Sequence, residues 1–167
     1  MAKTYSLPKA GTATAATKVA NESFARALPL SDQQDFEKAR RGFIASIDGP
    51  IKTPDGRVAW DTHAFAFLKE PAPDTANPSL WRQAQLNANH GLFEVADGIY
   101  QVRGYDMALM TLVRGDTGWI IIDCLICIET AQAALKLAND NLRERPVSAV
   151  LITHTHADHF GGLRGVL

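Results

Sequence analysis

Short apolar segments, a helical segment and a long apolar run follow one another in the second half of the chain. After His90, four segments are rich in β-branched and aromatic residues, and Gly and Asp residues separate them. This composition predicts consecutive strands joined as antiparallel hairpins. The four predicted strands cover residues 93–95, 99–102, 108–113 and 119–123.

A helical period then replaces the strand pattern. Between Glu129 and Leu142, apolar residues fall on one stripe and polar residues lie on the other side, as in an amphipathic helix. Pro146 ends this element, and Val147 to Thr153 is an almost continuous apolar run, which predicts a strand buried on both faces. A strand reached through a right-handed helical crossover points to an α/β fold, with a site at the carboxyl end of that strand.

That strand leads into the sequence Thr153-His154-Thr155-His156-Ala157-Asp158-His159-Phe160-Gly161-Gly162. Imidazole and carboxylate groups are common ligands of transition metals. His154 and His156 lie two apart and are expected to face the same side and hold one ion, while Asp158 and His159 on the following turn reach a second ion. The alternative is a polar surface loop that happens to be rich in histidine.

Two neighbouring divalent ions would lower the pKa of a bridging water, which predicts hydrolysis of an ester, amide, thioester, phosphate or sulfate. In this hypothesis Asp158 is a metal ligand that also positions the water. Asp123 ends the strand before the predicted helix and is a candidate for orienting the loop through hydrogen bonds. Its alternative role is an ordinary strand end or helix cap.

We interpret the cysteines and the histidines outside this motif as structural residues. Cys124 and Cys127 form a single C-x-x-C, which could be half of a zinc site, a redox pair or two core residues. We favour the core, because no second pair completes a site of four thiolates. His63 and His90 have no partner motif, and we expect structural roles for them.

The overall composition excludes several classes of partner. Hydrophobic residues make up 46% of the chain and charged residues 21%, with a net charge of -1, so we expect no binding to nucleic acid or to anionic lipid. No stretch has the roughly 20 apolar residues that span a bilayer. The start of the chain has no apolar run typical of a secretory signal, which predicts a cytoplasmic location.

The first half of the chain is predicted to be an extension rather than a second domain. Residues 1 to about 20 suggest a poorly ordered tail, and a helix is expected over residues 31–41 with Ser31 as its cap. Turn-forming dipeptides recur over residues 48–78, so this region is expected to wrap over a neighbouring surface. We therefore divide the chain into an extension, residues 1–89, and a partial domain, residues 90–167.

The sequence from Thr153 to Gly162 resembles the T-H-x-H-x-D-H-x-G-G motif of the metallo-β-lactamase superfamily. Further segments resemble the amino-terminal portion of its alkylsulfatases, which degrade detergents such as dodecyl sulfate. These segments are Arg40–Ala45, Gly56–Asp61, Asn77–Gln83, Gly91–Val95 and Asp97–Gly104.

The resemblance implies the first half of an αββα sandwich and two zinc ions, with His154 and His156 on one and Asp158 and His159 on the other. It also implies hydrolysis of linear alkyl sulfate esters to alcohol and sulfate. The resemblance is also compatible with a homodimer and with a periplasmic or secreted location. The family's further ligands would lie beyond Leu167, so we expect a truncated chain. The alternatives are a thioester or lactam hydrolase on the same scaffold and a catalytically silent fragment.

Overall fold

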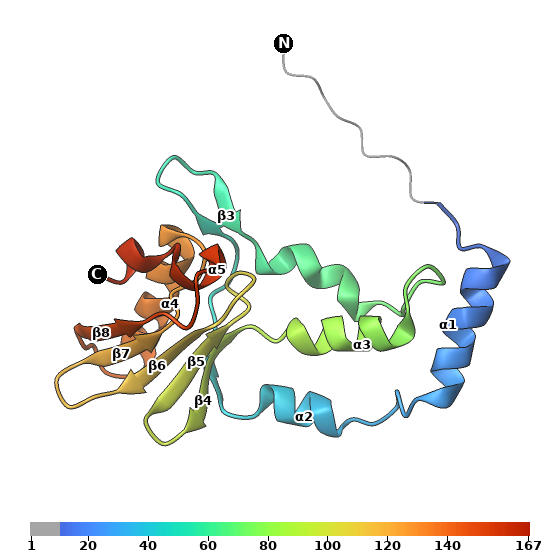
Figure 1. Cartoon of the computed structure of the whole chain (residues 1–167), viewed down its shortest axis with the longest axis horizontal. Coiled ribbons are helices and arrows are strands. Elements are labelled where there is room, and N and C mark those ends of the chain that lie inside the picture. The colour runs from blue at the N-terminus through green and yellow to red at the C-terminus, as the bar shows by residue number, and fades with distance from the viewer. Residues whose placement is uncertain (1–10) are drawn as a thin grey trace, which may run out of the picture.

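The computed structural model describes residues 11–167, which form a mixed α/β structure built on a six-stranded sheet (Figure 1). The sheet has the order β1-β4-β5-β6-β7-β8. Only the β7–β8 pair is parallel, and the other neighbours are antiparallel. Its strands are β1 (Phe43–Ala45), β4 (Gly91–Ala96), β5 (Ile99–Arg103), β6 (Met110–Arg114), β7 (Trp119–Ile122) and β8 (Val147–Leu151).

The predicted strands and the predicted crossover helix are confirmed, with boundaries shifted by one or two residues. Helix α4 (Ile128–Asn141) connects β7 to the parallel strand β8. Alternate side chains of β5, β6 and β7 point toward one face of the sheet and are buried, as the two-residue period of a strand requires. The core consists mainly of these side chains and the buried stripe of α4, which includes Ala131, Ala134 and Ala138.

The burial of β8 differs from the prediction. Leu151 is 54% exposed, and Val147 and Val150 are only half-buried. The reason is topological: β8 is the last strand of the sheet and pairs only with β7. Within residues 11–167, β8 is therefore not buried on both faces, although its composition is apolar.

The amino-terminal part contains more regular structure than the composition suggests. Residues 1–10 of the predicted disordered tail lie outside the described residues, but its later part is wrong, because helix α1 covers Ala15–Ala27. The hydroxyl of Thr14 accepts a hydrogen bond from the Thr17 N–H and caps this helix. Helix α2 (Gln34–Arg40) confirms the helix predicted over residues 31–41, but it starts later. Asp32 rather than Ser31 accepts a hydrogen bond from the Gln34 N–H.

The region expected to wrap over a neighbouring surface forms local elements. A two-stranded hairpin, β2 (Ile51–Lys52) and β3 (Val58–Trp60), is followed by a 3-10 helix, η1 (Thr62–Lys69). Helix α3 (Pro78–Asn87) was not predicted, although Asn77 caps it and Pro78 begins it in the usual way. Ile51 belongs to the core cluster and Trp60 packs against it, so this region does cover part of the core.

Two short helices complete the fold, α5 (Ala157–Phe160) and the 3-10 helix η2 (Leu163–Gly165). Strand β1 comes from the first half of the chain and pairs with β4. The boundary between residues 89 and 90 stays a prediction. Within residues 11–167, no helix combines the length and apolar character that crossing a membrane requires.

Candidate metal centre

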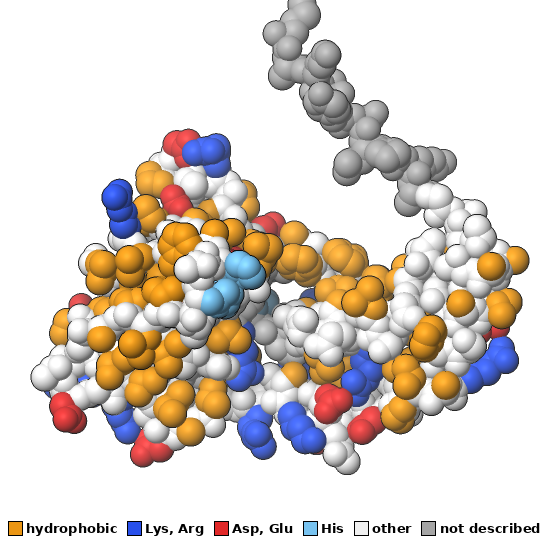
Figure 2. All heavy atoms as spheres, viewed as in Figure 1, with side chains coloured by type: hydrophobic (Ala, Val, Ile, Leu, Met, Phe, Trp, Pro, Cys, Tyr) orange, Lys and Arg blue, Asp and Glu red, His pale blue; other side chains and the backbone are white. Residues whose placement is uncertain are grey.

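The predicted ligands lie on a loop that leaves β8 at its carboxyl end and enters α5. Residues 154–159 form this segment, which we call the metal loop. His154 and His156 are exposed, whereas the side chains of Asp158 and His159 are 26% and 23% exposed. Figure 2 shows the histidine side chains beside a hollow between the sheet and the helices, with hydrophobic side chains nearby.

The four side chains converge in two pairs. The Nε2 atom of His154 lies 3.1 Å from Nδ1 of His156, which confirms that these two residues face the same side. The Nε2 atom of His159 lies 3.4 Å from Oδ2 of Asp158. The two pairs are adjacent, because the ring centroids of His154 and His159 are 4.0 Å apart.

These separations fit the donor set of a divalent ion. Two donor atoms bound to one tetrahedral zinc at about 2.0–2.2 Å each lie roughly 3.3 Å from one another. Both pairs are close to this separation. Among residues 11–167, however, no group of three or more His, Cys, Asp or Glu side chains is placed to hold one ion. Each pair supplies two donor atoms, fewer than the three protein ligands that a catalytic zinc usually has.

Asp123 anchors the metal loop to the end of β7. Its carboxylate accepts hydrogen bonds from the Thr153 N–H at 2.8 Å and the Thr153 hydroxyl at 2.7 Å, and its Oδ2 lies 2.7 Å from Nδ1 of His159. Asp123 has a φ of 56°, a left-handed conformation that Asp adopts more readily than most residues. Bonded in this way, Nδ1 of His159 carries the hydrogen and Nε2 remains available as a ligand.

The same contacts change the pKa values of both groups. Burial alone would raise the pKa of Asp123, but the hydrogen bonds from Thr153 and His159 outweigh it, and the pKa is lowered. The hydrogen bond to Asp123 raises the pKa of His159 despite a smaller opposing effect of burial, and nearby negative charges add to the increase. Both shifts favour the ion pair.

Two glycines of the motif let the loop lie close against the β7–α4 connection. A side chain on Gly161 would overlap the carbonyl oxygen of Ile126, and one on Gly162 would overlap that of Cys124. The Gly162 N–H donates to the Leu125 carbonyl at 2.9 Å. Sequence reasoning recorded these glycines as part of the motif but did not identify their packing role.

Asp106 is a second anchor that sequence reasoning missed. This buried carboxylate accepts from the N–H groups of Ala108 and Ile126 and from the hydroxyl of Thr130. It thereby ties the start of β6 and the start of α4 to the β7–α4 connection. Its position in a Gly-Tyr-Asp turn between two strands was the only available signal, and a turn Asp is too common to single out.

The cysteines and the two lone histidines lie outside the two donor pairs, although the Cys124 N–H donates to the His159 carbonyl at 2.9 Å. Cys124 is fully buried in the core, as predicted, and burial together with the charge of Asp123 raises its pKa to about 11. The prediction is wrong for Cys127, which is half-buried and outside the core cluster, with its Sγ 3.3 Å from the Thr130 hydroxyl. His63 lies 3.4 Å from Asp48, and His90 bonds the Ala88 carbonyl.

Comparison with known proteins supports the predicted resemblance. Residues 103–167 match the family model described as the Metallo-beta-lactamase superfamily. Over 93% of its length the chain is 52% identical to a linear primary-alkylsulfatase from a Pseudomonas species. Over 90% of its length it is 50% identical to the alkyl/aryl-sulfatase BDS1 of Saccharomyces cerevisiae. These alignments cover 23% and 24% of the two relatives.

A solved structure gives the same result for the fold. The stereoselective inverting sec-alkylsulfatase Pisa1 from a Pseudomonas species superposes with a TM-score of 0.87 and 49% identity, covering 94% of this chain and 25% of that one. The α/β fold and the likeness to metallo-β-lactamase-fold alkylsulfatases are thus confirmed. The chain spans about a quarter of the length of the relatives it matches.

Proposed function

We propose that this chain supplies part of the active site of a metal-dependent alkylsulfatase, which hydrolyses linear alkyl sulfate esters such as dodecyl sulfate to alcohol and sulfate. The observation that carries this proposal is the convergence of four metal-ligand side chains in two pairs at the carboxyl end of β8. The identity of about half to three alkylsulfatases supports the choice of substrate class.

Two zinc ions fit the donors best, because imidazole and carboxylate ligands suit zinc. His154 and His156 would hold one ion, and Asp158 and His159 the other. When bound, such ions polarise the ester and make hydroxide available near neutral pH.

The chain itself orients these donors. Asp123 fixes the ring of His159 and the start of the loop, and Asp158 presents its carboxylate to Nε2 of His159. In this proposal Asp158 both holds its ion and positions the water.

A chimera tests the proposal in a complete enzyme. Residues 1–167 would replace the matching quarter of the Pseudomonas linear primary-alkylsulfatase, and sulfate release from dodecyl sulfate would be measured after loading with zinc. We expect turnover in the chimera. His154→Ala should reduce it by at least about 100-fold, since loss of even a group that supports a metal ligand costs about 10–100-fold.

His63→Ala is the matched control, because this histidine is exposed and lies outside the metal loop. It should leave turnover within about twofold of the chimera. A chimera that folds and binds zinc but hydrolyses thioesters or lactams instead of dodecyl sulfate would contradict the proposed substrate class. One that binds no zinc would contradict the metal centre.

A further inference from the structure

We propose that a cavity between η1, α3 and the end of β5 holds the alkyl chain of the substrate while the sulfate group lies at the metal loop. This inference rests on the proposed function and assigns a place to the apolar part of the substrate. We call the cavity the tail cavity. It has a volume of about 280 Å³.

Apolar side chains from three elements form most of its wall. Trp60 and Phe65 meet with their ring centroids 5.9 Å apart, and the only polar atom of Trp60, Nε1, already donates to the Gly104 carbonyl at 2.9 Å. Trp60 and Phe65 therefore offer a hydrocarbon chain apolar contact, and the indole N–H is already paired. The apolar lining residues are Trp60, Phe65, Leu68, Ala84 and Ala88.

The tail cavity shares a wall with a second cavity that reaches the metal loop. Asn87, Gly104 and Asp106 line both, and the second cavity, of about 570 Å³, is also lined by Asp158 and His159. Both oxygens of Asp106 already accept hydrogen bonds within the fold. In the wall shared by the two cavities, the carboxylate of Asp106 is therefore already occupied by hydrogen bonds within the fold.

The second cavity adds apolar surface next to the metal loop. Met107 is 71% exposed and Leu109 is 42% exposed, and both line this cavity together with Asp158 and His159. Exposed apolar side chains beside polar donors are typical of a ligand site. An alkyl chain that starts at the metal loop would therefore meet apolar contacts before it reaches the tail cavity.

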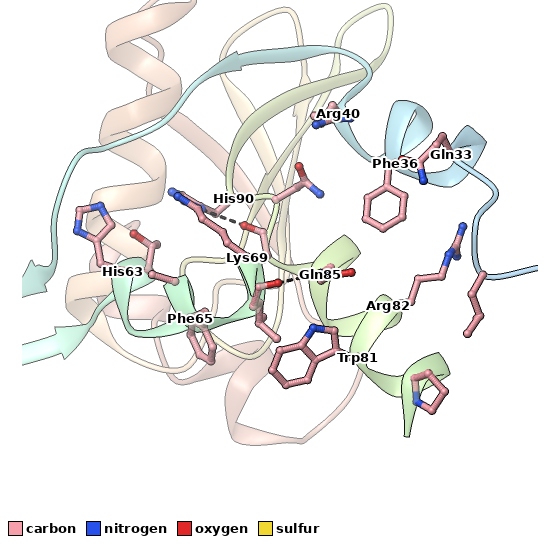
Figure 3. Close-up of a pocket in the computed structure, with 17 residues that line it drawn as sticks. Gln33, Phe36, Arg40, His63, Phe65, Lys69, Trp81, Arg82, Gln85 and His90 are labelled. Atoms are coloured by element: carbon pink, nitrogen blue, oxygen red, sulfur yellow. Dashed lines mark hydrogen bonds between the residues drawn. The ribbon is translucent and has the colours of Figure 1, made fainter. Parts of the chain in front are cut away.

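A wider cavity of about 670 Å³, shown in Figure 3, shares lining residues with the tail cavity. The described residues that line it include Arg40, Lys69 and Arg82 but no Asp or Glu, and Arg82 already forms an ion pair with Asp35. Its positive lining favours the approach of an anionic amphiphile. The two cavities share Phe65, Leu68, Ala88 and His90 as well as Thr62, whose buried hydroxyl has no hydrogen-bond partner within residues 11–167.

Chain length provides the test, because burial of one methylene contributes roughly 0.8 kcal/mol, or about fourfold in affinity. Binding of hexyl, octyl and decyl sulfate to the full chain would be measured by titration calorimetry below the micelle concentration. We expect the affinity to rise about fourfold per methylene. Ala84→Leu fills the tail cavity from α3 and should reduce the difference between hexyl and decyl sulfate to within about twofold.

Two further variants distinguish filling of the cavity from a general effect of the added volume on folding. Ala88→Leu enters the same cavity from another position and should flatten the series in the same way. Ala64→Leu adds the same volume to an exposed residue of η1 outside the lining and should preserve the slope. An unchanged slope in folded Ala84→Leu and Ala88→Leu proteins would overturn the inference.

The same series with alkanols separates this inference from the proposed function. If the chimera hydrolyses dodecyl sulfate but the cavity variants keep the slope, only the tail cavity is refuted. If the chimera is inactive, yet alkanols and alkyl sulfates both show a slope that the variants remove, the cavity is supported and the sulfatase function fails. A slope absent from both series in the unmodified chain would also overturn the inference.

Discussion

Replacement of Asp123 by Ala should destabilise the chain by about 3 kcal/mol, even without metal. Its carboxylate is 9% exposed and bonds the Thr153 N–H, the Thr153 hydroxyl and His159. The hydroxyl keeps an alternative partner in Nδ1 of His154 at 3.0 Å, and the His159 ring can reach water. The main loss is therefore the Thr153 N–H bond to a charged acceptor, about 1.5–3 kcal/mol. The left-handed backbone adds roughly 1 kcal/mol for Ala.

Asp123→Asn should cost less, about 1–1.5 kcal/mol, because Asn tolerates the left-handed conformation and keeps one acceptor oxygen. Asp158→Ala is the control on the same loop. Among residues 11–167 the only ion pair of Asp158 is a 3.4 Å contact with a partly exposed histidine, so this substitution should cost less than about 1 kcal/mol. Urea unfolding in the presence of a chelator gives all three values. Equal losses for Asp123→Ala and Asp158→Ala would refute the anchoring role.

The difference in unfolding free energy between wild type and Asp123→Ala should depend on pH, because folding shifts the pKa values of Asp123 and His159. The lowered pKa of Asp123 gives stability that is present above the unfolded value of about 3.9 and is lost as the pH falls through the folded value. The raised pKa of His159 gives stability that is fully present below about 6.5 and is lost as the pH rises through its folded value. The difference between wild type and Asp123→Ala should thus be largest from about pH 4 to pH 6.5. A difference that keeps growing up to pH 9 would contradict the ion pair.

Three further variants or reactions probe the packing beneath the metal loop. Gly162→Ala should lower the free energy of unfolding by at least about 2 kcal/mol, because its methyl group would overlap the Cys124 carbonyl; a neutral effect in urea unfolding would contradict the close approach. Cys124, with its pKa raised to about 11, should react with iodoacetamide at pH 8 at least about tenfold more slowly than the half-buried Cys127, as measured by peptide mass spectrometry. Asp106→Ala should cost about 3–5 kcal/mol in the same unfolding assay, because it removes a buried acceptor of three hydrogen bonds; a loss below about 1 kcal/mol would argue against this anchor.

Local periodicity accounts for what the sequence predicted well. The strands after His90 and the helix before Pro146 each repeat a side-chain pattern with the period of their structure, and the sheet built from them has the expected crossover. The facing pair of His154 and His156 followed from the same rule, since residues two apart on an extended segment share a side. These features depend on neighbours along the chain, which a sequence displays directly.

Features that depend on distant partners were missed or misjudged. The burial of β8 depends on which elements cover it, and the apolar run from Val147 to Thr153 carries no such information. Asp106 bonds groups up to 24 positions away, so its turn position alone could not reveal them. Helix α1 was missed for a different reason: its Ala and Thr composition suggested disorder, but Thr14 caps it and Lys18 pairs with Asp74 at 2.7 Å.

The metal loop acquires its shape from contacts that are not themselves metal ligands. A loop of alternating donors after a strand could take many conformations, and each unconstrained residue costs about 1–2 kcal/mol to order. Asp123 fixes one end of this loop, and the close packing of Gly162 on the β7–α4 connection fixes the other. The donor pairs are thus held in place by hydrogen bonds and backbone packing before any ion binds. In the proposed metal centre, an ion would therefore bind donors on a loop that folding of β7, α4 and β8 has already ordered.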